Sequence, residues 1–299
     1  MKKRFLQGFT FFLVASIGLS SCGDSQPDLE VDIDETVDST ISENTGPVIS
    51  YSVPTPNELF EIVKALGGTL DMSLINSLEN TDKYVDLKSK ALNFGVYSAD
   101  LGYMSCFDNG IEFLKYTKAI EDLAADLGIS EVFDKTLIDR IESNEENYDS
   151  LFTISNQTYY ESYSYLEENK KGQELSLIII GGYIESVYII SSLVENYSDN
   201  NEIIEKIGDQ HLVLDNIIDF CAQYADIEAV SEALSDVIQL QSVFEENMTF
   251  VEASGDSKNT SDDNGVATFS SQGSYQMNQA TFDAVVAEIT ILRNKITQK

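Results

Sequence analysis

The sequence predicts an all-α fold, a multi-helix bundle of about eight to ten helices. From Tyr51 onward, apolar residues recur at the spacing of one helix face almost throughout the chain. No proline follows Pro56, and stretches that alternate strictly between apolar and polar residues are nearly absent. Short polar turns separate the periodic segments, which indicates antiparallel neighbouring helices.

Several predicted helix ends carry residues that start or stop a helix. Pro56 suits the first turn of the first helix, and Gly67 and Gly68 end it. Gly128 closes another helix, and Ser130 resembles a capping-box start for the next. The predicted helices cover residues 56–66, 70–78, 82–107, 111–127, 130–141, 144–169, 173–197, 200–224, 226–252 and 276–296, and residues 254–274 form a polar loop.

Two of these segments echo one another. Residues 92–103 resemble residues 178–188, because both are apolar and place glycine before a tyrosine and an acid. A duplicated helical hairpin would explain the echo, and a chance match between two buried helices is the alternative. Glycines such as Gly95, Gly181 and Gly182 each cost about 1 kcal/mol in a helix, so we expect close helix–helix contact to compensate.

Residues 1–21 have the organisation of a lipoprotein signal peptide. A basic start precedes an apolar segment over residues 9–19, whose 11 residues are too few to span a membrane as a helix. Leu-Ser-Ser directly before Cys22 resembles the lipobox of bacterial lipoproteins. The resemblance implies that Cys22 is lipidated and becomes the first residue. An ordinary secretory signal with a chance cysteine is the alternative.

The chain is strongly acidic, with 51 Asp and Glu against 18 Lys and Arg and a formal net charge of −33. Residues 22–50 are acidic and contain no aromatic residue, so we expect a flexible tether ahead of a helical domain over residues 51–299. The charge repels phosphate backbones and excludes nucleic acid as a partner. The expected partners are the membrane, through the N-terminal lipid, and an unknown protein or small molecule. The expected location is the cell envelope, at the outer membrane.

Two carboxylates interrupt apolar helix faces in the echoing segments. Asp100 and Glu185 have apolar or tyrosine neighbours three and four residues away, on their own side of the helix. A buried carboxylate needs a hydrogen bond, a partner charge or a proton. We favour a structural role, with Arg140 preferred over Arg293, the other arginine after the signal peptide, as the partner cation. The alternative is a small-ligand pocket between the two helices. The candidate cluster comprises Tyr97, Asp100, Tyr103, Arg140, Tyr183, Glu185 and Tyr188.

We find no motif for catalysis, a cofactor or a metal. His211 is the single histidine, and neither Cys106 nor Cys221 belongs to a Cys-x-x-Cys pair. The two cysteines are candidates for a disulfide in an exported protein, with buried free thiols as the alternative. An aromatic stripe at helical spacing predicts core packing more than a carbohydrate-stacking surface. Its members are Phe152, Tyr159, Tyr163 and Leu166.

Three segments resemble a group of functionally uncharacterised, all-helical exported lipoproteins of Gram-negative bacteria. These segments are residues 51–56, 91–103 and 181–185. The resemblance covers most of the chain from Tyr51 to about residue 253, implies a lipid anchor and a helical fold, and supplies no catalytic or binding residue. We therefore expect a lipid-anchored envelope protein, not an enzyme and without a cofactor, that has a binding or interaction role. The alternatives are a small-ligand-binding lipoprotein and, less favoured, a carboxylate-dependent hydrolase.

Overall fold

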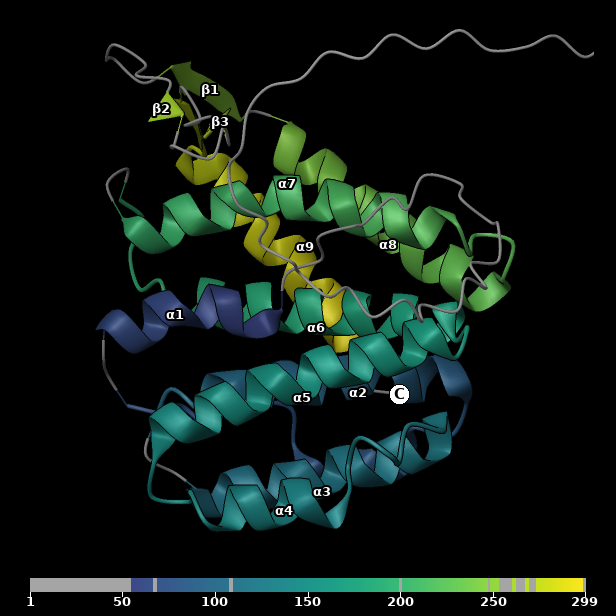
Figure 1. The fold of residues 1–299 in the computed structure, drawn as a ribbon. Coiled ribbons are helices and arrows are strands. Elements are labelled where there is room, and N and C mark those ends of the chain that lie inside the picture. The colour runs from purple at the N-terminus through teal and green to yellow at the C-terminus, as the bar shows by residue number, and fades with distance from the viewer. Residues whose placement is uncertain are drawn as a thin grey trace, which may run out of the picture. The chain divides into compact units, whose positions relative to one another are not determined.

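The computed structural model describes residues 55–66, 69–107, 110–198, 201–246, 248–252, 260–261, 267–268 and 273–297. Within these ranges the chain forms nine α-helices, one 3-10 helix and four short strands, which confirms the all-α bundle (Figure 1). The helices are α1 (Pro56–Leu66), η1 (Leu78–Lys83), α2 (Leu87–Met104), α3 (Gly110–Leu127), α4 (Lys135–Glu142), α5 (Tyr148–Glu168), α6 (Gly172–Ser192), α7 (Glu202–Ala222), α8 (Glu228–Glu245) and α9 (Gln279–Thr297). The strands are β1 (Thr249–Glu252), β2 (Thr260–Ser261), β3 (Ala267–Thr268) and β4 (Gly273–Gln276). The predicted signal peptide, Cys22 and the tether lie outside the described residues.

The helices of this domain are arranged in layers around α2 and α6. These two helices pack against each other, and α3 and α4 lie beyond α2 and α5 (Figure 1). On the other side, α7 and α8 lie beyond α6, and α9 runs between them and the central pair. The apolar core is continuous across all of these layers, so α2 and α6 are buried on nearly every side.

Glycines allow the close contact between α2 and α6. A Cβ atom on Gly95 would lie 2.0 Å from the carbonyl oxygen of Ile178, and one on Gly181 would lie 1.9 Å from that of Leu92. No side chain fits at such distances, so the expectation that these glycines serve close packing is confirmed. The two echoing segments thus face each other at the centre of the fold, while their common origin stays a prediction.

Helix α6 is long and apolar enough to cross a membrane by length and composition, the one such helix in the described part of the chain. Its 18-residue apolar window is 89% buried inside the fold. Contacts with α1, α2, α5, α7, α8 and α9 surround it. Its hydropathy is therefore explained by its place in the core of a layered bundle.

Two helices begin later than predicted because an aspartate caps them. Asp86 accepts the backbone N–H three residues further on at 2.9 Å, so α2 begins after it and not at residue 82. Asp134 caps α4 in the same way, also at 2.9 Å. The predicted helix start at Ser130 is therefore wrong.

Two segments predicted as helix have another structure. Residues 70–77 form turns without a regular helix, and η1 follows them. Residues 249–252, predicted as the end of a helix, form strand β1, which pairs antiparallel with β4. The described parts of the predicted loop over residues 254–274 contain β2, β3 and the start of β4. The partner of β1 lies 27 residues further on, from Thr249 to Gln276, too far for a local pattern to reveal it, whereas β2 and β3 pair with each other.

Candidate functional site

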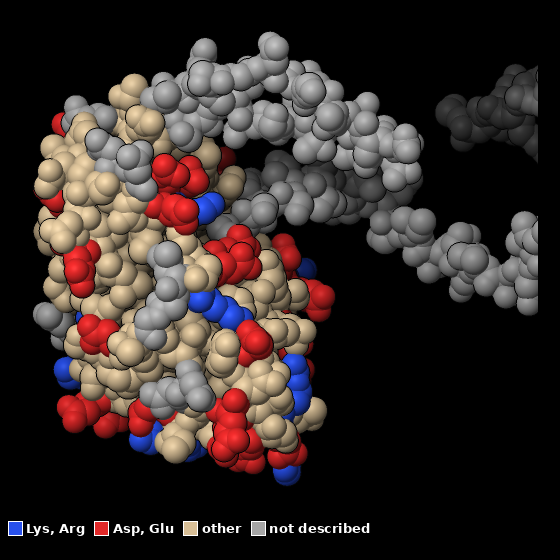
Figure 2. Space-filling view, turned by 90° about the vertical axis from the view of Figure 1, so that its left-hand side faces the viewer, with Lys and Arg blue, Asp and Glu red and all other residues tan. Residues whose placement is uncertain are grey.

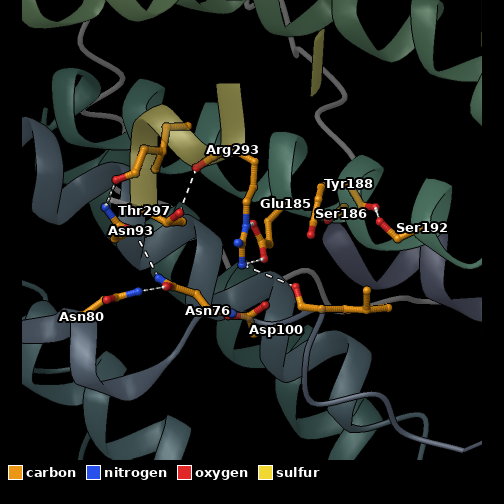
Figure 3. Close-up of polar contacts among 12 residues, drawn as sticks. Asn76, Asn80, Asn93, Asp100, Glu185, Ser186, Tyr188, Ser192, Arg293 and Thr297 are labelled. Carbon is orange, nitrogen blue, oxygen red and sulfur yellow. Dashed lines mark hydrogen bonds and ion pairs between the residues drawn. The ribbon is translucent and has the colours of Figure 1, made fainter. Parts of the chain in front are cut away.

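Asp100 and Glu185 lie together in the centre of the bundle, with Arg293 beside them (Figure 3). They come from α2, α6 and α9, and neither carboxylate has any exposed surface. The Arg293 guanidinium donates two hydrogen bonds to Glu185, from Nε at 3.0 Å and from Nη2 at 3.1 Å. This bidentate ion pair supplies the charge compensation that a buried carboxylate needs.

The cluster also holds a carboxyl proton. Asp100 Oδ2 accepts the backbone N–H of Asn76 at 3.1 Å, whereas Oδ1 accepts no hydrogen bond within the described residues. Burial, and then the negative charge of Glu185, raise the pKa of Asp100 well above its usual value. Glu185 already receives two hydrogen bonds from Arg293, so the raised pKa of Asp100 places the proton on Asp100 and not on Glu185. Asp100 is therefore neutral, and the three side chains together carry no net charge.

Asn76 connects these side chains to a wider buried polar network (Figure 3). Its side-chain amide donates to the Tyr84 hydroxyl at 2.9 Å and accepts from Asn80 at 2.7 Å. Its backbone carbonyl accepts the Tyr116 hydroxyl at 2.8 Å. Tyr84 and Asn93 donate in turn to carbonyl groups in the last turn of α9, each at 3.1 Å. The network thus satisfies groups that a helix end leaves without intrahelical partners.

The irregular segment 71–77 explains why polar side chains interrupt the apolar faces of α2, α3 and α9. Its backbone lacks the hydrogen bonds of a helix, so the core helices supply them. Tyr97 and Arg293 donate to its carbonyl groups at 2.9 and 3.4 Å. The Tyr103 hydroxyl accepts one of its N–H groups at 3.3 Å. These side chains therefore tie an irregular segment to the centre of the bundle.

The predicted cluster is brought together in part. Tyr97, Asp100, Tyr103 and Glu185 are all buried, and all but Glu185 bind the backbone of segment 71–77. The Tyr188 ring lies 4.7 Å from the Arg293 guanidinium carbon, in a cation–π contact. The Tyr97 and Tyr103 hydroxyls thus form hydrogen bonds with backbone groups of segment 71–77.

Two predicted members of the cluster lie elsewhere. Arg140 is on α4 and donates to Gln157 at 2.7 Å, so its predicted pairing with a buried acid is wrong. Tyr183 is on α6, and its hydroxyl donates to the backbone carbonyl of Gln210 on α7 at 3.2 Å. Glycine packing leaves no room for a ligand where Gly95 meets α6.

From the sequence we ranked Arg293 below Arg140 as the partner cation, although its position carries a signal for that role. It follows Ile289 by four residues and precedes Ile296 by three, and both of these are buried. A cation on the buried stripe of a helix is a stronger candidate for an interior ion pair than one beside the stripe. Asn76, the hub of the network, had no such signal because it lies outside any regular element.

The arrangement of Asp100 and Glu185 suits structure better than acid–base chemistry on a substrate. Both acids are fully buried, and neither lines the cleft described next. Hydrolysis of a glycoside by two carboxylates requires that both reach the scissile bond. The hydrogen bonds of these two acids go to Arg293 and to backbone.

A cleft lies on the opposite side of α6, between α1, α5, α6 and α7. It has a volume of about 180 Å³. Its polar lining includes Tyr183, Tyr159, Thr55 and Ser186, and its rim carries Lys206 among other charged residues. Tyr183 therefore lines a pocket, as predicted. This pocket lies between α6 and the helices α1, α5 and α7, however, and not between α6 and α2 as predicted. Tyr159 belongs to the predicted aromatic stripe, of which Tyr159 and Leu166 are buried, and Phe152 and Tyr163 are partly buried against the core.

The cysteines and the histidine form no further site. Cys106 and Cys221 are both buried free thiols, so the disulfide alternative is wrong. Their thiols donate to different backbone carbonyls, those of Phe60 and Ser176. The described residues contain no group of three or more His, Cys, Asp or Glu side chains that could hold a metal ion.

Comparisons with protein-family models, with curated proteins and with solved structures found no match. The resemblance to exported helical lipoproteins therefore stays a prediction.

Proposed function

We propose that this chain is a lipid-anchored protein of the bacterial cell envelope with a non-catalytic binding role. The cleft between α1, α5, α6 and α7 is the observation that carries the binding role. Concave sites with apolar walls and a few convergent polar groups are where small molecules bind. The two buried acids support the non-catalytic part, because a neutral Asp100 and an ion-paired Glu185 are used within the core.

The proposed anchor rests on the sequence that ends at Cys22. The expected acyl chains would each contribute about 0.8 kcal/mol per buried CH₂, enough for stable attachment when two or more are present. On the face drawn in Figure 2, acidic side chains are spread widely and outnumber the basic ones. Electrostatic attraction to anionic lipid would therefore add little, and the lipid would do the anchoring.

Membrane fractionation of full-length protein tests the anchor. We expect wild type to remain with the membrane pellet after a high-salt wash, and Cys22→Ala to be released. Cys106→Ser is the matched control, because it changes a buried thiol and leaves the anchor in place. A Cys22→Ala protein that still sediments in high salt would contradict the proposed anchoring.

A further inference from the structure

Two residues that line the cleft between α1, α5, α6 and α7 have hydroxyl groups without a hydrogen-bond partner among the described residues, and the Thr55 hydroxyl is fully enclosed. Thr55 is 3% exposed, and its Oγ1 has no hydrogen-bond partner among the described residues. Tyr159 is 8% exposed, and its hydroxyl has no partner among the described residues. An enclosed hydroxyl without a partner, such as that of Thr55, is destabilising. Together with the unpartnered Tyr159 hydroxyl in the lining of the same cleft, it indicates that something else binds there.

The volume of the cleft limits the size of the ligand. At about 180 Å³ it is smaller than the roughly 300–1,000 Å³ of sites for drug-sized ligands and cofactors. Apolar cavities of about 150 Å³ hold one six-membered ring. A single ring therefore fits, whereas a dinucleotide or a long acyl chain does not.

The lining defines the chemistry of that ring. Tyr183 and Ser186 use their protons within the protein, so their oxygens remain as acceptors towards a ligand. Burial raises the pKa of Tyr159, so its hydroxyl keeps its proton and can donate. Thr55 can both donate and accept. The apolar walls are formed by Pro56, Leu59, Ile179, Val213 and Ile217.

Charges occur only towards the rim of the lining. Glu58 and Lys206 are exposed and Asp209 is half-buried. Glu58 is already engaged, since it accepts the backbone N–H of Thr55 at 3.2 Å and the Tyr160 hydroxyl at 3.3 Å. A charged group bound among the buried lining residues would have no counter-charge there, so this part of the cleft favours a neutral ligand.

We propose that this cleft binds a neutral, hydroxyl-bearing six-membered ring, namely a pyranose monosaccharide. A pyranose has apolar faces for the aliphatic and tyrosine walls, and hydroxyl groups that both donate to and accept from the lining. The proposal rests on the binding role proposed above and names its ligand class.

Calorimetric titration of the detergent-solubilised full-length protein tests the proposal. The probes are D-glucose, D-galactose and D-mannose, with glucuronate as a charged analogue and phenol as a ring without the sugar hydroxyls. We expect saturable one-to-one binding of at least one neutral pyranose with a Kd below about 1 mM, and weaker binding of glucuronate and phenol.

Two variants connect binding to the hydroxyls. Tyr159→Phe and Thr55→Val keep the shape of the lining, and each should weaken pyranose binding about five- to tenfold. Tyr163→Phe is the matched control, because Tyr163 lies one turn further along α5 and packs on Phe220 instead of lining the cleft. It should leave the affinity unchanged.

Three outcomes would overturn the proposal. They are the absence of pyranose binding, tighter binding of phenol or glucuronate than of any pyranose, and pyranose binding that neither hydroxyl variant weakens. Thermal unfolding of each variant checks that it is folded. Membrane release of Cys22→Ala is measured independently, so a failed titration would leave the anchor standing.

Discussion

Replacing Arg293 by methionine removes the positive charge beside Glu185 and keeps a flexible side chain that fills much of the same space. In the folded protein the Glu185 side chain has no exposed surface, and that of Arg293 is 13% exposed. The change removes two hydrogen bonds to the carboxylate and one to the backbone carbonyl of Leu74. It also removes the cation above the Tyr188 ring.

Removal of one partner from a buried ion pair costs about 3–5 kcal/mol, because the other charge stays buried. Domains are stable by about 5–15 kcal/mol, so Arg293→Met should make this fold marginal. Adding Glu185→Gln removes the stranded charge and keeps the shape of the side chain. The double variant should therefore recover at least half of the lost stability. Lys295→Met is the control on the same helix: its ion pair with Asp236 is partly exposed and should contribute at most about 1 kcal/mol.

Urea unfolding followed by circular dichroism measures these free energies at pH 5 and pH 8. Without Arg293, the folded-state pKa of Glu185 rises further above its unfolded value of about 4.3. A raised folded-state pKa favours folding at low pH, and that contribution is lost as the pH rises through the folded-state pKa. The deficit of Arg293→Met should therefore be larger at pH 8 than at pH 5. A deficit below about 1 kcal/mol at both pH values would refute the buried ion pair.

Three further predictions test the core. Asp100→Asn mimics a neutral acid. The raised pKa of Asp100 makes wild type lose stability as the pH rises above about 4, so the unfolding free energy of the variant should increase relative to wild type with rising pH. A difference in unfolding free energy that is independent of pH would contradict this. Gly95→Ala would place a Cβ 2.0 Å from a carbonyl oxygen of α6 and should lower the unfolding free energy by about 1–3 kcal/mol or more. Gly208→Ala, where a Cβ has ordinary space, should be neutral or stabilising in the same unfolding assay. Burial raises the pKa of Cys106 and Cys221 to about 12, so peptide mapping should find both thiols alkylated only after unfolding, and labelling of either one in native protein at neutral pH would show that it is accessible.

The helices could be predicted from the sequence because their apolar spacing is local. The main helical segments were located, and glycine and proline marked some of their ends. The start of α2 was misplaced because the segment before Asp86 continues an amphipathic pattern that the cap overrides. Strand β1 was missed because its partner, β4, lies more than 20 residues later (Thr249 pairs with Gln276).

The buried acids could be predicted, but the contacts around them could not. Asp100 and Glu185 disturb an apolar periodicity, and that disturbance is visible in the sequence. The partner of Glu185 lies 108 residues away, and periodicity does not say which helices meet. Asn76 acts through its backbone as well as its side chain, and such contacts leave no trace in a pattern of residue types.

A side-chain carboxyl carbon NMR titration of Asp100, assigned by comparison with Asp100→Asn, measures directly whether this residue holds its proton inside the bundle. At pH 7 we expect the chemical shift of a neutral acid, with no titration near 3.9, the ordinary pKa of aspartate. An Asp100 that is ionised at pH 7 and titrates near a pKa of 3.9 would show that its carboxyl group faces solvent. That result would contradict the structural role assigned to the buried acids.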